Sequence, residues 1–285
     1  MMRWNCVAIV GVGLIGGSIG KALLHRKLAR KVVGIGRDEG RLAAAEADGA
    51  ITDWTTDVET GVGEAELAVV CTPVDMVADF VRRVASGMQQ GGLITDAAST
   101  KRSIVALAAS DASVGRMDGV TFIGSHPLAG SHASGCLHGR EDLFLDRTVV
   151  VTPTEATPED DRRRIIAFWQ SLGAVVRTMS PDEHDRALAA TSHLPHLVAA
   201  ALAGVTEVQF RGLVGSGWLD STRIAAGSVD VWEQILLDNR DYVLKALAKF
   251  ATVLDSFQQA LRDEDRAMLV DLLATGKKQR ETLGN

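Results

Sequence analysis

Residues 7–16, Val-Ala-Ile-Val-Gly-Val-Gly-Leu-Ile-Gly, decide the fold of this chain. Four apolar residues predict a short buried strand, and a G-x-G-x-x-G pattern follows at once, ahead of residues with the apolar spacing of a helix. Glycines in this pattern permit a tight turn, a close approach of the backbone to a pyrophosphate, and packing of the helix against the strand. The helix N-terminus offers N–H groups to the phosphates. We predict dinucleotide contacts at Gly11, Gly13, Leu14, Ile15 and Gly16; a glycine-rich corner without a ligand is the alternative.

The second predicted strand, residues 31–35, bears on the choice of nucleotide. A protein that prefers NAD usually carries Asp or Glu at the end of this strand, where it binds the ribose 2′-hydroxyl. Here Gly36 takes that position and Arg37 follows. A guanidinium in place of a carboxylate favours a 2′-phosphate, so we favour NADP over NAD. Asp38 comes next, and a one-residue shift of the strand end would restore an acid and favour NAD.

The remaining pattern divides the chain into two predicted domains. Strands at 65–71, 93–96, 120–123, 147–152 and 174–178 alternate with helices at 41–48, 76–86 and 158–172. Such alternation predicts an α/β domain, a Rossmann-like, doubly wound, mostly parallel sheet, over residues 1–179. From residue 180 helical patterns replace β-rich runs, which predicts an all-α domain for substrate binding and dimerisation over residues 180–285. There an apolar stripe with alternating spacings of four and three runs through Val243, Leu247, Phe250, Leu254, Phe257 and Leu261. It fits a dimer seam or a helix facing the core of its own subunit; we expect a homodimer.

Composition excludes several classes of partner. With 285 residues, a net charge of −6 and 23% charged residues, the chain has the balance of a soluble protein, and we expect neither nucleic acid nor a membrane as partner. No apolar run has the length of a membrane span and no signal peptide is visible. Three widely spaced cysteines suggest reduced thiols in the cytoplasm. The seven histidines lack the spacing of a metal site, so we expect no metal.

Three polar loops are predicted at the carboxyl ends of strands, where α/β enzymes bind their ligands. The first holds Thr72 and Pro73, which we assign to the nucleotide. In the second, Ser99 is either an active-site hydroxyl, the N-cap of the next helix, or both. The third, residues 124–135, is Gly-Ser-His-Pro-Leu-Ala-Gly-Ser-His-Ala-Ser-Gly. Pro127 biases His126 toward an extended backbone, which would hold its imidazole in one direction. A surface turn with incidental histidines is the alternative for this segment taken alone.

Over nearly its whole length the chain resembles the prephenate/arogenate dehydrogenase family of tyrosine biosynthesis, and most of all a monofunctional prephenate dehydrogenase. The first motif, Gly-Val-Gly-Leu-Ile-Gly-Gly-Ser at 11–18, is shared by many dehydrogenases. The specific part is the combination of four others: Asp96-x-x-Ser99-x-Lys101, Gly-Ser-His-Pro-Leu-Ala-Gly at 124–130, Ser-His-Leu-Pro-His at 192–196, and Asp-Ser-Thr-Arg-Ile-Ala at 220–225.

The resemblance implies oxidative decarboxylation of prephenate to 4-hydroxyphenylpyruvate, or of arogenate, with hydride transfer to NAD(P). His126 would accept the proton of the 4-hydroxyl or hold it in a strong hydrogen bond, and a neutral imidazole is a competent base at physiological pH. Ser99 would bind the same hydroxyl. At the substrate we expect in addition Arg223 on a carboxylate, His196 at the side-chain end, Asp220 orienting Arg223 or a neighbour, and Ser131 and His132.

One position departs from the family pattern. Some relatives carry a carboxylate where this chain has His132, so the role of that carboxylate does not transfer. We expect no regulatory ACT domain, and the sequence does not separate prephenate from arogenate. Two other functions are considered: a two-domain reductase of β-hydroxy acids or imines, which does not need the pair His126-Pro127, and a catalytically silent NADP-binding sensor, which need keep none of His126, Ser99 and Arg223.

Overall fold

The computed structural model describes residues 3–110, 119–130 and 135–282. Its first part is an eight-stranded sheet with the order β3-β2-β1-β4-β5-β6-β7-β8. Among the described residues every neighbouring pair is parallel except β6 and β7. The strands are β1 (Trp4–Val10), β2 (Ala29–Ile35), β3 (Asp53–Thr55), β4 (Leu67–Val70), β5 (Leu93–Asp96), β6 (Thr121–Pro127), β7 (Thr148–Thr152) and β8 (Val175–Thr178). The predicted Rossmann-like, mostly parallel sheet is confirmed.

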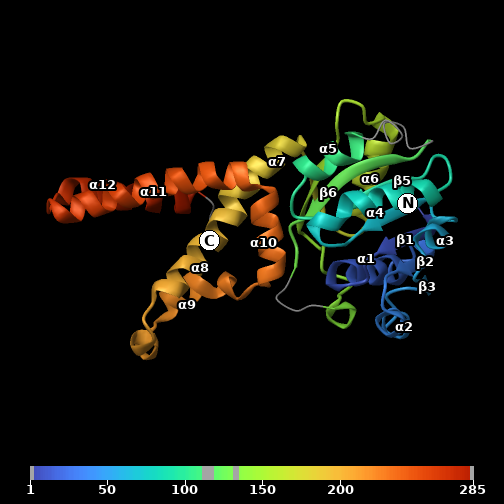
Figure 1. Ribbon diagram of the computed structural model, residues 1–285, viewed down its shortest axis with the longest axis horizontal. Coiled ribbons are helices and arrows are strands. Elements are labelled where there is room, and N and C mark those ends of the chain that lie inside the picture. Colours follow the sequence, from blue (N-terminus) through green and yellow to red (C-terminus); the bar gives the residue numbers. More distant parts are fainter. Residues whose placement is uncertain (1–2, 111–118, 131–134, 283–285) are drawn as a thin grey trace.

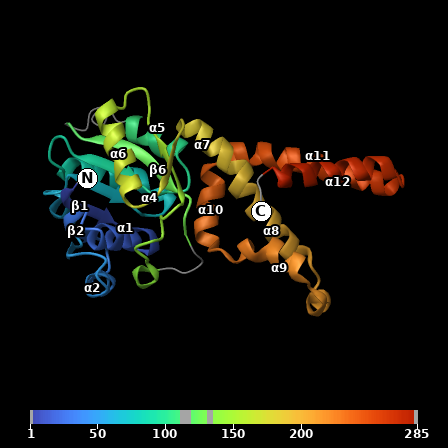
Figure 2. The ribbon, with the colours of Figure 1, turned by 180° about the vertical axis from the view of Figure 1, so that it is seen from behind.

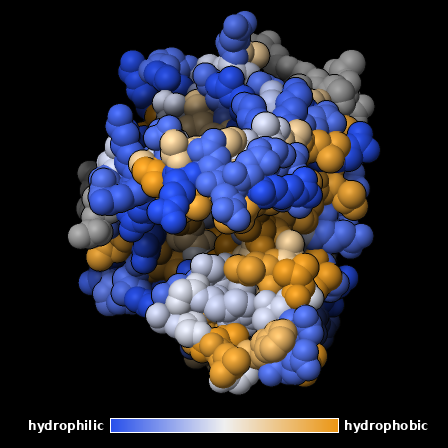
Figure 3. All heavy atoms as spheres, turned by 90° about the vertical axis from the view of Figure 1, so that its left-hand side faces the viewer, coloured by the Kyte–Doolittle hydropathy of each residue, from blue (hydrophilic) through white to orange (hydrophobic). Residues whose placement is uncertain are grey.

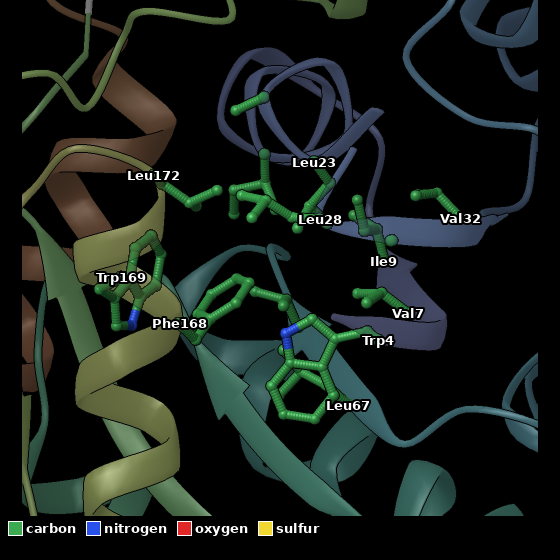
Figure 4. Close-up of a cluster of buried hydrophobic side chains, with 14 of the residues drawn as sticks. Trp4, Val7, Ile9, Leu23, Leu28, Val32, Leu67, Phe168, Trp169 and Leu172 are labelled. Atoms are coloured by element: carbon green, nitrogen blue, oxygen red, sulfur yellow. The ribbon is translucent and has the colours of Figure 1, made fainter. Parts of the chain in front are cut away.

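Helices cover both faces of this sheet because successive side chains of a strand point to opposite faces. Val7 and Ile9 face the layer that contains α1 and α6, whereas Ala8 and Val10 face α3, α4 and α5. The helices are α1 (Leu14–His25), α2 (Glu39–Ala47), α3 (Val58–Val62), α4 (Val74–Gly87), α5 (Arg102–Ser110) and α6 (Glu159–Ser171), with a 3₁₀ turn η1 (Cys136–His138). Figure 4 shows the first of these layers, in which buried side chains of β1, β2, β4, α1 and α6 pack together around Trp4, Leu23, Phe168 and Trp169.

Only helices occur among the described residues after β8. They are α7 (Pro181–Leu188), α8 (Leu194–Val205), α9 (Ser216–Thr222), α10 (Val229–Asp238), α11 (Arg240–Arg262) and α12 (Arg266–Glu281), with short turns η2 (Ala189–His193), η3 (Val208–Leu213) and η4 (Arg223–Ala226). The predicted start of this part is present as a capping box, in which Ser180 and Glu183 bond each other's backbone, with Pro181 opening α7. Helices α7 and α10 lie against the sheet part, while α8–α9 and α11–α12 extend away from it in two arms (Figures 1 and 2).

One helical run is more apolar than the sequence analysis anticipated. Pro181–Val205, which joins α7, η2 and α8, is long and apolar enough to cross a membrane by length and composition alone, with a mean hydropathy of 1.4. Its buried polar residues His184, Asp185, His193 and His196 face the protein interior. The run therefore places ionisable groups inside the protein, as the site below shows.

The structure differs from the sequence prediction in the extent of one strand. Residues 124–127 were expected in a polar loop, but β6 continues through them to Pro127. The reason is a partner: Gly124 to Pro127 pair antiparallel with β7, with His126 opposite Val150. Pro127 is tolerated because β5 pairs with β6 only as far as Ile123, so this end of β6 is an edge on the side that the missing N–H would face. The short elements β3 and α3 were not predicted.

Candidate functional site

A pocket of about 490 Å³ lies where the sheet meets the helical part. Its walls come from the loop after β5, the end of β6, the turn η2 and helix α10. The lining residues are Ser99, His126, Pro127, Leu128, Ala129, Leu188, Thr191, Ser192, His193, Trp232 and Ile235. The structure thus brings together Ser99 and His126, which the sequence analysis assigned to the same hydroxyl.

His126 is a buried imidazole at the carboxyl end of β6, with 9% of its surface exposed. The extended backbone expected before Pro127 is present, since His126 is a strand residue paired with Val150. Burial lowers the pKa of His126 well below its usual value, and the nearby His184, Lys101 and His193 lower it further. The ring is therefore neutral at physiological pH, the state that a proton acceptor needs.

A chain of hydrogen bonds leads away from His126. Its Nδ1 lies 2.9 Å from Nε2 of His184, and Nδ1 of His184 lies 2.7 Å from Oδ1 of Asp185. The Asp185 carboxylate also accepts the backbone N–H groups of Lys101 at 2.8 Å and Arg102 at 2.9 Å. It therefore caps α5, which begins at Arg102, and Ser99 is not the N-cap of that helix.

A buried ion pair fixes the loop that carries Ser99. The ammonium of Lys101 donates to Oδ2 of Asp96, and both side chains are fully buried. The other oxygen of Asp96 accepts the backbone N–H of Ser125 at 2.9 Å. Burial lowers the pKa of Lys101 against the opposing effect of Asp96. This pair ties the β5 loop to β6 beside His126, so Ser99 and His126 are held by one rigid framework.

The helical wall of the pocket carries a second buried imidazole. Nδ2 of Asn239 donates to the backbone carbonyl of Asp185 at 2.7 Å and to Nδ1 of His193 at 3.1 Å. Burial lowers the pKa of His193 to about 4. The His193 ring meets Trp232 edge-on, with 6.2 Å between ring centroids. His193 comes from the π-helical turn η2. Because π-helical turns are frequent at functional sites, we count this turn as part of the candidate site.

Three predicted substrate residues lie elsewhere in the helical part. His196, on α8, is buried and stacks on Trp232 at 3.6 Å between centroids, so it lies behind the pocket wall. Its Nδ1 is buried, and no hydrogen-bond partner for it occurs in the described part of the chain. Asp220 on α9 and Arg223 on η4 are exposed and do not line this pocket. Ser131 and His132 lie outside the described residues.

The turn between β1 and α1 has the shape that a dinucleotide needs. Gly11 has φ of +90°, and a Cβ there would lie 2.8 Å from the carbonyl oxygen of Cys71. A Cβ on Gly16 would lie 2.3 Å from the oxygen of Gly11, whereas Gly13 faces open space. The first turn of α1 has no side-chain cap, so its amides remain available to an anion.

The other predicted nucleotide residues border the same turn. The amide of Gly11 bonds the carbonyl of Ile35 at 2.8 Å, and the amide of Cys71 bonds that of Val10 at 2.7 Å, so the ends of β2 and β4 flank the glycines. The buried hydroxyl of Thr72 has no hydrogen-bond partner among the residues that the structure describes, and Pro73 precedes α4. Arg37 is exposed just beyond β2. These residues fit a dinucleotide.

Sequence reasoning missed several residues of the site. His184, Asp185 and Trp232 were given no role in a site. Lys101 and His193 were quoted within motifs but received no role. A hint was present in the adjacent pair His184-Asp185 near a helix N-terminus, yet periodicity cannot show that this pair reaches a histidine 58 positions away. No group of three or more His, Cys, Asp or Glu side chains that could hold a metal occurs in the described part of the chain.

Comparisons with known proteins agree with this architecture. The model of the prephenate dehydrogenase nucleotide-binding domain matches residues 19–178, and that of the prephenate dehydrogenase dimerization domain matches residues 180–275. The prephenate dehydrogenase of Bacillus subtilis is 32% identical over 286 residues, which cover 98% of this chain and 76% of the relative. The resemblance stated from the motifs is confirmed.

Two solved structures are similar over almost their whole length. Prephenate dehydrogenase from A. aeolicus, in complex with hydroxyphenyl propionate and NAD⁺, has a TM-score of 0.88 and 28% identity and covers 98% of each chain. Synechocystis arogenate dehydrogenase has a TM-score of 0.81 and 26% identity, covering 98% of this chain and 99% of that one. With two family models spanning most of its length, the chain belongs to the prephenate dehydrogenase family.

Proposed function

We propose that this protein is a prephenate dehydrogenase, which converts prephenate to 4-hydroxyphenylpyruvate and carbon dioxide in tyrosine biosynthesis. The observation that carries this proposal is the pocket lined by the neutral His126 and by Ser99, at the same edge of the sheet as the glycine turn after β1. A reaction that oxidises an alcohol needs a proton acceptor and a hydride acceptor close together, and the edge of the sheet supplies a place for each.

His126 and Ser99 handle the proton of the substrate's 4-hydroxyl. Nε2 of His126 accepts the proton of the 4-hydroxyl as C4 loses hydride, and Ser99 binds the same oxygen. The ring carboxylate then leaves as carbon dioxide, its bonding electrons enter the ring, and the oxygen recovers a proton. The bound nicotinamide supplies the hydride acceptor. Thus no proton is gained or lost overall by His126.

Arg223, Asp220 and His196 are proposed at the substrate. A guanidinium binds a carboxylate through two parallel hydrogen bonds, a geometry that lysine cannot reproduce. His196 is held by Trp232, which itself lines the pocket. Arg223 and Asp220 lie on the same helical part but outside this pocket wall, so the proposal requires that closure of the two parts or a second subunit brings them to the substrate. Ser131 and His132 remain proposals from the sequence.

We propose NADP as the preferred nucleotide. Strand β2 ends at Ile35, so Gly36 occupies the place of the usual ribose carboxylate and the exposed Arg37 follows. Asp38 has another task, because its Oδ1 accepts the amide of Arg41 at 3.0 Å and caps α2. The A. aeolicus relative was solved with NAD⁺, so the choice has to be measured on this chain.

The helical part is proposed to form a homodimer, with the domain boundary between residues 179 and 180. The predicted stripe on α11 is largely exposed: Leu247 is 39%, Leu254 51% and Leu261 64% accessible. A groove on α11 and α12, lined among others by Val253, Phe257, Met268 and Leu272, shares Phe257 with this stripe. The other arm, α8–α9, also exposes apolar side chains, among them Val205, Val208 and Leu213, and Figure 3 shows apolar residues gathered in its lower half, where this arm lies. Surfaces of this kind usually contact another protein. We place the enzyme in the cytoplasm.

Steady-state assays of purified protein with prephenate and arogenate, each against NADP and NAD, test these proposals. We expect the highest kcat/KM for prephenate with NADP. Faster turnover of arogenate would make the protein an arogenate dehydrogenase, and a strong preference for NAD would assign the ribose to Asp38. The variant Arg37→Gln should raise KM for NADP and leave KM for NAD unchanged, because only NADP carries the 2′-phosphate. Turnover of neither substrate would overturn the function.

A further inference from the structure

We propose that His184 and Asp185 act as positioning residues that fix the tautomer of His126, so that its Nε2 is the free proton acceptor in the pocket. This inference rests on the proposed function for its role in the reaction, but its geometry stands by itself. The two residues come from α7 in the helical part, whereas His126 comes from β6. The hydrogen-bonded series His126–His184–Asp185, which we call the relay, therefore joins the two halves of the molecule, the sheet part and the helical part, at the catalytic base.

The direction of each hydrogen bond follows from Asp185, the last member of the series His126–His184–Asp185. Burial would raise the pKa of Asp185, but hydrogen bonds from His184 and from the amides of Arg102 and Lys101 hold it below its usual value. An ionised carboxylate only accepts, so Nδ1 of His184, 2.7 Å away, must donate. A neutral imidazole has one N–H, which leaves Nε2 of His184 as an acceptor.

The same rule then fixes His126. Because Nε2 of His184 accepts, Nδ1 of His126, 2.9 Å away, must carry the proton. Nε2 of His126 is consequently unprotonated and is the one ring nitrogen left to accept a proton from a ligand. Reversing either hydrogen bond would place a proton on Nε2 and leave a donor where the reaction needs an acceptor.

Asp185 is held in place by both halves of the protein. Its two carboxylate oxygens accept the amides of Lys101 and Arg102 at the start of α5, where the helix dipole favours a negative charge. Its backbone carbonyl accepts Nδ2 of Asn239. These contacts leave the carboxylate little freedom to move, so it presents one oxygen to His184 in a set direction.

The charges around the relay keep His126 neutral before the reaction and stabilise it once it has accepted a proton. Burial most of all, and then His184, Lys101 and His193, lower the pKa of His126 and so disfavour a proton on it. Burial and Lys101 lower the pKa of His184, whereas Asp185 and Asp96 oppose that effect. When the hydroxyl proton arrives at Nε2 of His126, its Nδ1–H remains bonded to His184. The new positive charge is then stabilised through His184 by Asp185, and no bond of the relay has to break.

Two variants of His184 separate positioning from mere support of the fold. Leucine fills the space but cannot accept a hydrogen bond, whereas the amide oxygen of glutamine can. We expect His184→Leu to lower kcat with prephenate by at least about tenfold and to shift the acid limb of the kcat/KM profile. His184→Gln should recover most of the loss. The surface variant His25→Leu, at an exposed position, is the control and should match the wild type. Equal kcat and equal pH profiles for wild type and His184→Leu would overturn the relay.

A second measurement needs neither substrate nor an altered chain. In wild-type protein with ¹⁵N-labelled histidine, the resonances of His126 should show a protonated Nδ1 and an unprotonated Nε2. A protonated Nε2 in the neutral ring would overturn the proposal even if every variant failed to fold. Since this spectrum does not depend on the reaction, it also separates failure of the relay from failure of the proposed function, which the wild-type assay alone decides.

Discussion

At the scale of single residues, the site depends on keeping His126 both buried and neutral. Burial removes water that would stabilise an imidazolium, and Lys101 adds a nearby positive charge, so the pKa of His126 falls well below its usual value. A base with a low pKa is always ready to accept but binds its proton weakly. That suits a reaction in which the same oxygen gives up a proton and later recovers it.

Replacing His126 should therefore affect turnover far more than nucleotide binding. We expect His126→Asn to lower kcat by at least about 100-fold, the usual size for the loss of a general base. The Kd for the nucleotide should not change, because His126 lies at the end of β6 and not in the turn between β1 and α1. Stopped-flow turnover and nucleotide titration measure the two quantities. Near-normal turnover in the variant would remove His126 from its proposed role.

At the scale of elements, α11 has a surface that a single chain does not cover. Its stripe begins with the buried Val243 and becomes more exposed toward Leu261. The stripe residue near the sheet thus packs within its own chain, whereas Leu254 and Leu261 at the far end are exposed, although α12 covers another side of the helix there. The heptad spacing left open a helix facing the core of its own subunit or a dimer seam. The first interpretation fits the end near the sheet, and the second would apply to the far end if that end forms the dimer contact.

A charge placed on that far end should weaken the dimer. We expect Leu254→Glu to raise the dimer Kd by at least about tenfold, because burying an unpaired carboxylate costs more than the roughly 1.4 kcal/mol that a factor of ten represents. Lys249→Glu is the matched control, since it changes more charge about 140° around the same helix. Analytical ultracentrifugation compares them. A dimer of unchanged Kd in Leu254→Glu would exclude this surface.

At the scale of the whole molecule, local patterns in the sequence predicted the sheet, its glycine turn and the change to helices at residue 180. They succeeded because strand length, glycine placement and capping are short-range properties, as the Ser180–Glu183 capping box shows. The extension of β6 to Pro127 and the contact of His184 with His126 depend on partners distant in sequence. No periodicity encodes such pairs, so the second half of the site had to come from the structure.

The buried histidines between the two halves make the stability of the whole chain depend on pH. The folded state lowers the pKa of His126, His184 and His193, whereas in the unfolded chain each histidine has a pKa of about 6.5. Below that value the unfolded chain binds more protons than the folded one, so the free energy of unfolding falls as the pH falls. Stability is thus complete above about pH 6.5 and is lost toward the folded-state pKa values.

His193 offers the clearest test of this dependence because its pKa is lowered to about 4. From about pH 7.5 to about pH 5 it should account for a loss of about 2 kcal/mol in the free energy of unfolding. We therefore measure the free energy of unfolding by urea denaturation at both pH values. Between them, His193→Gln should lose less of this free energy than wild type does, by the same amount. The exposed His138 provides the control, since His138→Gln should lose as much stability as wild type. If His193→Gln also loses as much as wild type, protonation of His193 does not oppose folding, and the pH dependence must come from other groups.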